Sequence, residues 1–124
     1  MTLPAIPYHT KGLDHVVLRA GDIDVMLEFY RDVLGLPVAK HNKPLGLWHL
    51  QAGDSMIDLI NINGPLGRDG LLPSTKAQNV DHLALKITPF DSDALRAYFE
   101  AHGVEVGPDR IRFGANGDGP SIHL

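Results

Sequence analysis

Two histidines, each beside an aspartate, are the residues of this sequence whose types and spacing best suit chemistry. The segment Asp14–Arg19 reads DHVVLR and recurs as Asp81–Lys86, DHLALK, so an acid, a histidine, three apolar residues and a base keep their order. The chain has no cysteine, which leaves His, Asp and Glu as its strong metal ligands. The repeat therefore predicts that His15 and His82 are matched ligands of one metal ion.

Asp58 is the third candidate ligand. It is the sole ionisable residue of the apolar stretch Ser55–Ile62, and a carboxylate there is costly to bury unless a cation, a proton or a hydrogen-bond donor compensates it. Two histidines and one carboxylate can hold a divalent ion such as Fe, Mn, Zn, Ni or Co and leave positions open for water or substrate. The competing interpretation is a salt bridge from Asp58 to Arg19 or Lys86.

The remaining candidates have weaker support from the sequence. A single histidine near a strand start is usually half-exposed and satisfied by hydrogen bonds, and only the repetition favours ligation at the two matched positions. His49 is a candidate substrate contact or proton carrier, with a rim histidine as the ordinary alternative. Trp48 and Arg19 are the other candidate substrate contacts. No role is assigned to His9, His41, His102 and His123.

Hydrophobic spacing predicts the elements that must position these side chains. From Ile23 the apolar residues recur at intervals of three and four, which predicts a helix capped by Asp22 and ended by Gly35. A second helix is predicted from a cap at Asp91 or Ser92, with Gly103 closing it. A tight turn is predicted at Gly53-Asp54. The predicted strands are Leu13–Arg19, Leu36–His41, Gly46–Gln51, Ser55–Ile62, Val80–Ile87, Val104–Phe113 and Pro120–Leu124.

The repeat and these elements predict an α+β fold of two copies of a β-α-β-β-β module in one domain. The first module covers residues 12–62, a linker covers 63–79, and the second module covers 80–124 with three strands where the first has four. Side chains alternate along a strand, so His15 and His82 lie on equivalent faces turned away from their helices. A pseudo-twofold axis would then bring the two imidazoles together.

Composition and charge exclude several classes of partner. The net charge is -4 and the eleven Lys and Arg residues are dispersed, which argues against nucleic acid. No apolar run approaches the ~20 residues that cross a bilayer, and Met1–Thr10 lacks the pattern of a signal peptide. We therefore expect a cytoplasmic protein, and its small size favours a homodimer.

In these motifs the chain resembles the vicinal oxygen chelate superfamily, which includes glyoxalases, bleomycin resistance proteins and extradiol dioxygenases. The resemblance implies paired modules that form a curved mixed sheet around a cleft with a metal ion. It implies His15 as the first-strand ligand, His82 as the fifth-strand ligand, and Asp58 at the fourth-strand position that glyoxalase-like members fill with glutamate. The segments that carry the resemblance are Gly12–Leu18, Phe29–Leu36, Asn79–Leu85 and Gly119–Ile122.

The sequence departs from this family pattern after Gly119–Ile122. In such proteins that segment precedes a further strand, whose glutamate completes the metal site, whereas here the sequence ends at Leu124. We expect the second module to lack its last strand, which leaves an unpaired sheet edge. Three explanations are open: a truncated chain, a dimer that covers the edge, or a member without full metal chemistry.

The resemblance implies a metal-dependent enzyme acting on a small substrate with vicinal oxygens, as an isomerase or lyase or as a ring-cleaving dioxygenase. The ion would act as a Lewis acid toward those oxygens. The alternatives are a non-catalytic protein of the bleomycin-resistance type that binds a drug or metabolite, or an inactive truncated relative.

Overall fold

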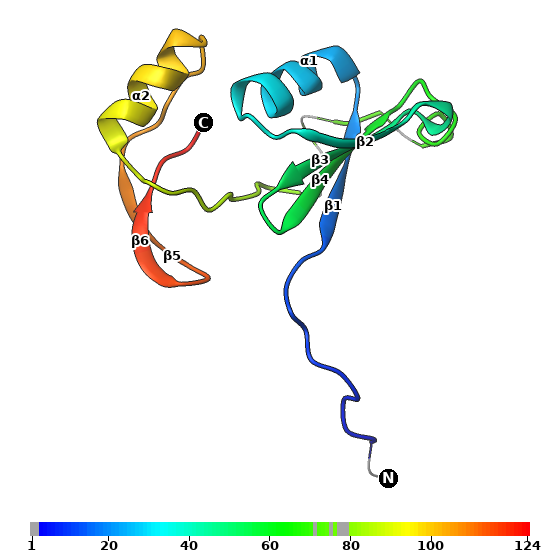
Figure 1. Ribbon diagram of the computed structural model, residues 1–124, viewed down its shortest axis with the longest axis horizontal. Coiled ribbons are helices and arrows are strands. Elements are labelled where there is room, and N and C mark those ends of the chain that lie inside the picture. The colour runs from blue at the N-terminus through cyan, green and yellow to red at the C-terminus, as the bar shows by residue number, and fades with distance from the viewer. Residues whose placement is uncertain (1–2, 71, 75, 77–79) are drawn as a thin grey trace. The chain divides into compact units, whose positions relative to one another are not determined.

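The computed structural model describes residues 3–70, 72–74, 76 and 80–124. It divides the chain into two compact units, Met1–Asn79 and Val80–Leu124. Figure 1 shows a sheet with a helix in the first unit, and a helix with a strand hairpin in the second. Among the described residues, no helix combines the length and the apolar character needed to span a bilayer.

The first unit is a four-stranded mixed sheet with one helical segment on one of its faces. The strand order is β1-β4-β3-β2, with β1 parallel to β4 and the other neighbours antiparallel. The four strands follow the predicted ones, with ends shifted by at most two residues. Along the chain the elements are β1 (His15–Ala20), α1 (Ile23–Leu27), a π-helical stretch (Glu28–Val33), β2 (Val38–Asn42), a 3-10 turn (Lys43–Leu45), β3 (Leu47–Ala52) and β4 (Ser55–Asn61).

The helical segment begins and ends where the sequence predicts. The Asp22 carboxylate accepts the backbone N–H groups of Asp24 and Val25 at 3.1 and 3.2 Å, which satisfies donors that the first turn leaves unpaired. Gly35 follows the last turn with φ 74°, a left-handed conformation that glycine adopts without steric cost. Both predicted boundaries are confirmed, although the second half of the segment is π-helical rather than α-helical.

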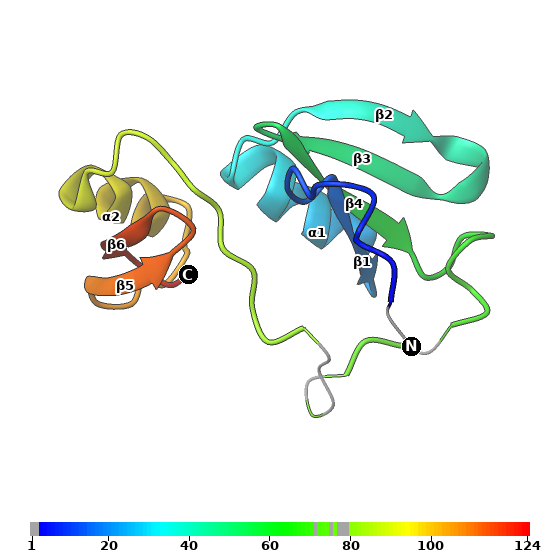
Figure 2. The same ribbon diagram turned by 90° about the horizontal axis from the view of Figure 1, so that it is seen from below.

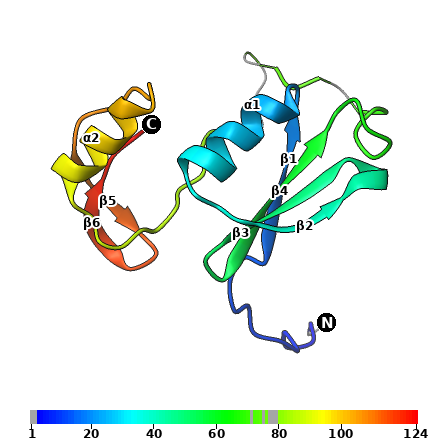
Figure 3. The same cartoon turned by 45° about the horizontal axis from the view of Figure 1, so that its top comes forward.

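The two faces of the sheet differ in what covers them. Ala20, Leu50 and Leu59 have no exposed surface and share one face, against which the helical segment packs (Figure 3). The strand registers place His15, His49 and Asp58 together on the opposite face. Strand alternation predicts this separation, so the apolar core fixes which face is left for polar chemistry.

The second unit contains one helix and one hairpin (Figure 2). Helix α2 (Ser92–Ala101) is capped by Asp91, whose carboxylate accepts the N–H of Ala94 at 3.1 Å. Gly103 closes it with φ 72°, so the predicted helix is confirmed. Strands β5 (Arg110–Gly114) and β6 (Gly117–Ser121) pair antiparallel around a tight turn.

Three strand predictions need correction in this unit. The structure assigns no strand to Val80–Ile87, so that prediction is wrong. The equivalent strand β1 forms because it pairs with β4, whereas the strands described in this unit, β5 and β6, pair only with each other. The strand predicted at Val104–Phe113 begins only at Arg110, after Pro108, which has no N–H for a ladder. The strand predicted at Pro120–Leu124 lies instead at Gly117–Ser121.

Asp109 joins the start of α2 to the segment before β5. Its carboxylate accepts a hydrogen bond from Ser92 Oγ at 2.6 Å and another from the Arg96 guanidinium, which also donates to the carbonyl of Gly107 at 2.8 Å. The hydrogen bond from Ser92, with that from Arg96, lowers the pKa of Asp109 below its ordinary 3.8. The ionised carboxylate is therefore the form that this network stabilises.

The lowered pKa predicts a small acid sensitivity of the second unit. A carboxyl group whose pKa is lower in the folded than in the unfolded state stabilises the fold above about pH 4, and this stabilisation is lost as the pH falls through the folded-state pKa. We expect Asp109→Asn to remove that part of the pH dependence, which lies below about pH 4. Urea unfolding at several pH values measures it, with the exposed Asp118→Asn as control. Identical pH slopes for the wild type and Asp109→Asn would contradict the prediction.

Candidate functional site

Asp58 is the one buried charged residue among the residues that the structure describes. It lies in β4 with 4% of its surface exposed, and β3 places His49 directly opposite it. Nδ1 of His49 is 3.0 Å from Oδ1 of Asp58. Even so, Oδ1 receives no hydrogen bond of acceptable geometry from the described residues. A hydrogen bond weakens steeply when its donor and acceptor are misaligned, so this oxygen is poorly compensated in spite of the short distance.

The contact between His49 and Asp58 was missed by the sequence analysis, although the sequence contains the information. A two-residue turn at Gly53-Asp54 pairs Ala52 with Ser55, and counting outward from that pair brings His49 opposite Asp58. The salt bridges considered for Asp58 were to Arg19 and Lys86. The structure places His49 beside Asp58. The Arg19 guanidinium donates to the carbonyl of Gly67 at 2.6 Å.

Each predicted histidine ligand is held by the aspartate that precedes it. Nδ1 of His15 lies 2.7 Å from Oδ2 of Asp14, and Nδ1 of His82 lies 2.7 Å from Oδ1 of Asp81. An ionised carboxylate only accepts hydrogen bonds, so Nδ1 carries the proton and the lone pair of a neutral ring is at Nε2. A carboxylate on the far nitrogen is the partner that metal-binding histidines commonly have. The repeat thus preserves a local geometry as well as a sequence pattern.

The electrostatic field at His15 favours positive charge. β1 pairs with β4 so that Val17 lies opposite Asp58, which puts His15 on the face that Asp58 occupies. The hydrogen bond to Asp14 raises the pKa of His15, desolvation opposes the rise, and the charge of Asp58 adds to it. An environment that stabilises an imidazolium also stabilises a bound cation at the same place. His15 and Asp58 therefore lie on one face of the sheet, where the charge of Asp58 acts on the His15 ring.

Trp48 lies apart from the other candidate substrate contacts. It shares the helix-covered face with Leu50, and its ring stacks on His41 with centroids 3.5 Å apart and planes at 14°. His41 lies in β2, as the predicted strand Leu36–His41 implies. Arg19 and His49 are on the other face, with Asp58. The sheet itself thus separates Trp48 from the face that carries the buried carboxylate.

The three predicted ligands are divided between the two units. His15 and Asp58 belong to Met1–Asn79, and His82 belongs to Val80–Leu124. Within the part of the chain that the structure describes, no three His, Asp or Glu side chains form a ready-made metal cluster. Ligation by His15, His82 and Asp58 together stays a prediction, supported by the local geometry of each residue.

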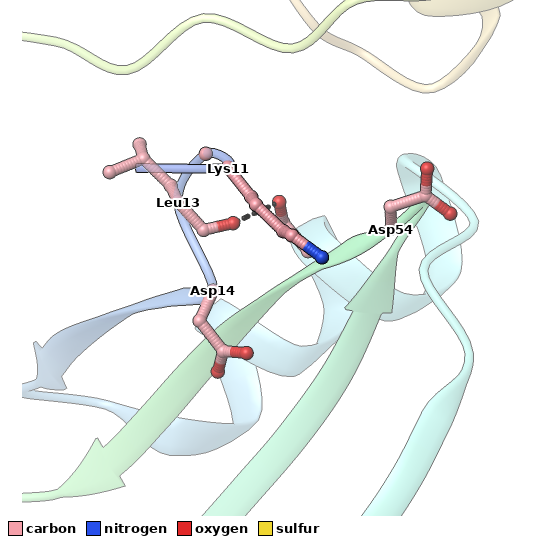
Figure 4. A pocket seen from close by; sticks show the side chains of 6 residues that line it. Lys11, Leu13, Asp14 and Asp54 are labelled. Atoms are coloured by element: carbon pink, nitrogen blue, oxygen red, sulfur yellow. Dashed lines mark hydrogen bonds between the residues drawn. The ribbon is translucent and has the colours of Figure 1, made fainter. Parts of the chain in front are cut away.

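A shallow depression lies where the chain enters β1 (Figure 4). It has a volume of about 350 Å³, and Ser55 Oγ closes one side by donating to the carbonyl of Leu13 at 2.8 Å. Its charged lining residues are Lys11, Asp14 and Asp54. Ligand sites are mostly apolar and concave, so this polar depression is better described as the rim beside the Asp14–His15 pair.

The fold and these residues define the class of protein. A strand, a helix and three strands, with the first strand parallel to the fourth, carry an aspartate-held histidine on β1 and a buried carboxylate on β4. This is the module of vicinal oxygen chelate proteins. Residues 12–117 match the Glyoxalase/Bleomycin resistance protein/Dioxygenase superfamily, and the chain belongs to that superfamily. No curated protein matches the sequence.

Solved structures with this fold support the assignment. An integron cassette protein from the mobile metagenome of V. cholerae is 25% identical, with a TM-score of 0.69, over 94% of this chain and 88% of its own. A structure from the mobile metagenome of V. pseudocholerae is 29% identical, with a TM-score of 0.69, over 94% and 87%. A lactoylglutathione lyase from Agrobacterium tumefaciens is 22% identical, with a TM-score of 0.53, over 88% and 81%, and shows a likeness of fold alone.

Proposed function

We propose that this chain is a metal-dependent enzyme that acts on a small substrate with vicinal oxygens. His15, His82 and Asp58 would hold one divalent ion such as Fe, Mn, Zn, Ni or Co. The observation that carries the proposal is the buried Oδ1 of Asp58, which lacks a well-directed donor among the described residues and faces the same side of the sheet as His15. Burying such an oxygen is costly unless something positive compensates it.

The donor set fits a borderline transition metal. Two imidazoles and one carboxylate are ligands that Fe, Mn, Zn, Ni and Co accept, and three protein ligands leave positions for water or substrate. When bound, such an ion supplies Lewis-acid polarisation of the substrate oxygens. The reaction is either isomerase or lyase chemistry or ring-cleaving dioxygenation, both of which the superfamily's description allows.

The side chains around the ligands have roles of their own in this proposal. Asp14 and Asp81 fix the ring orientation and the tautomer of the histidine beside each of them. His49 contacts Asp58, which positions that carboxylate and makes His49 the candidate to exchange a proton with substrate on the open face. Arg19 stays the candidate substrate contact on that face.

Metal binding tests the proposed function directly. Metal-free protein titrated with Ni²⁺ or Co²⁺ in a calorimeter is expected to bind one ion per chain. His15→Ala and His82→Ala should each weaken binding by more than the roughly 10- to 100-fold that loss of an outer partner of a ligand costs. His102→Ala, an exposed histidine after α2, is the matched control. A wild type that binds no divalent ion, or mutants that bind it unchanged, would exclude this function.

The second candidate is a non-catalytic protein that binds a drug or metabolite. It is favoured by the superfamily's description, which includes bleomycin resistance proteins as well as enzymes, and an inactive relative is the remaining alternative. A ligand that binds equally well before and after EDTA treatment would support this candidate. A ligand that binds only to metal-loaded protein would support the enzyme.

We also propose that the chain works as a homodimer in the cytoplasm. β1 and β2 are the outer strands of the four-stranded sheet, and proteins normally cover or blunt such edges because unpaired backbone groups recruit other strands. The absence of cysteine fits a compartment in which disulfides are not used.

A further inference from the structure

We infer that His123 is an additional ligand of the divalent ion and acts beside His82, an inference that rests on the proposed function. The sequence gives no reason to single out His123, which follows the last strand of the chain. The structure places its ring next to that of His82 within the unit Val80–Leu124. Two imidazoles from distant positions in the sequence thus meet in one unit.

The separation of the two rings fits a shared ion. Their centroids are 6.2 Å apart and their planes make an angle of 66°. A metal ion about 2.1 Å from one nitrogen of each ring would hold the centroids roughly 4.5 to 6.5 Å apart, with the larger values at wide N–metal–N angles. Nδ1 of His82 is engaged by Asp81, so its Nε2 has the lone pair for such an ion. The His82 side chain is 68% exposed, which leaves it open to an ion from solvent.

Hydrogen bonds to the preceding loop hold the backbone of His123 in place. Its carbonyl accepts the N–H of Gly107 at 2.8 Å, and the carbonyl of Gly107 accepts Arg96 Nη2 from α2 at 2.8 Å. The segment after β6 is therefore tied to the helix through Gly107. A ligand on an ordered backbone loses less conformational entropy when an ion binds than one on a free chain.

The extra imidazole also predicts which ions are preferred. Imidazole nitrogen suits Zn, Ni, Cu and Fe, whereas carboxylate, carbonyl and water oxygens suit Mg and Ca. A site with three histidines and one carboxylate should therefore favour Ni²⁺, Co²⁺ and Zn²⁺ strongly over Mg²⁺. The alternative is that the rings of His82 and His123 only pack edge to face and bind no ion. The affinity for divalent ions, measured with and without the His123 side chain, distinguishes packing from ligation.

The test is Co²⁺ and Ni²⁺ binding by the full chain, with the visible spectrum of bound Co²⁺ as a readout of the ligands. His123→Ala is expected to weaken the affinity for both ions by about 10-fold or more and to change the Co²⁺ spectrum. His102→Ala, the control, should behave as the wild type. Both substitutions replace exposed side chains, so thermal unfolding of the metal-free proteins should coincide.

The outcomes separate this inference from the function on which it rests. If the wild type and His123→Ala bind Co²⁺ with equal affinity and the same spectrum while His82→Ala does not, His123 is no ligand and the proposed function stands. If His102→Ala weakens binding as much as His123→Ala, the effect is not specific and the inference is overturned. A wild type that binds no ion overturns both.

Discussion

Asp58→Asn is expected to weaken divalent-ion binding by about 100-fold or more while leaving the metal-free protein at least as stable as the wild type. The substitution keeps the size of the side chain and removes the charge that attracts the ion. It also relieves the metal-free protein of a buried carboxylate whose Oδ1 lacks a well-directed donor among the described residues. Sites shaped for function commonly reduce stability in this way.

A purely structural role for Asp58 predicts the opposite result, namely that Asp58→Asn destabilises the metal-free protein. If Asp58 serves mainly as the ion-pair partner of His49, its loss leaves an uncompensated group in a buried position and should cost about 3–5 kcal/mol of unfolding free energy. Urea unfolding in EDTA measures the stability, and calorimetry with Ni²⁺ measures the affinity. Asp54→Asn, at the exposed turn after β3, is the control. A large loss of stability with unchanged affinity would assign Asp58 to the structure and not to the metal.

The burial of Asp58 could be predicted from the sequence, whereas its neighbour His49 was not predicted. One aspartate in an apolar strand implies a buried carboxylate whichever residues surround it. Its partner depends on the register between β3 and β4, which the short turn at Gly53-Asp54 fixes. Register relates residues across two strands, whereas the search for motifs compared residues along one strand at a time.

The incorrect prediction of a strand at Val80–Ile87 also arose because only residues along one segment were compared. Its alternation of polar and apolar residues copies that of β1, and alternation reports which residues suit a strand. A strand also needs a hydrogen-bonding neighbour, which β1 finds in β4. The contact between each repeated histidine and the aspartate before it nevertheless forms in both copies, because a contact between adjacent residues needs no partner strand.

The helices show what local sequence does and does not determine. The caps at Asp22 and Asp91 were predictable, because a carboxylate at the first turn bonds N–H groups only two or three residues ahead. The π-helical stretch Glu28–Val33 was not. There the N–H of Leu34 donates to the carbonyl of Phe29, five residues back, where an α-helix would use the carbonyl four residues back. This change in hydrogen bonding hardly alters the spacing of the apolar side chains, so the sequence pattern does not reveal it.

Leu59→Ala should have the largest effect on stability of any single change considered, a loss of about 2–5 kcal/mol. Leu59 is fully buried on the helix-covered face of β4, the strand that carries Asp58 on the other face. Removing its side chain leaves a cavity that rigid neighbours cannot fill, and the loss is a large share of the 5–15 kcal/mol that stabilises a typical domain. Urea unfolding measures it, with the 59% exposed Val25 changed to alanine as control.

Leu59→Ala and Asp58→Asn together distinguish the roles of the two faces of β4, one in stability and the other in metal binding. At low temperature, where Leu59→Ala is still folded, it should bind Ni²⁺ nearly as the wild type does, since its side chain points away from the ligands. Asp58→Asn should show the reverse pattern, with stability kept and binding lost. If Leu59→Ala is as stable as the Val25→Ala control, the helix-covered face is not the core. If it loses Ni²⁺ affinity while folded, then the packing on that face also holds Asp58 in place, and the carboxylate depends on the core behind it.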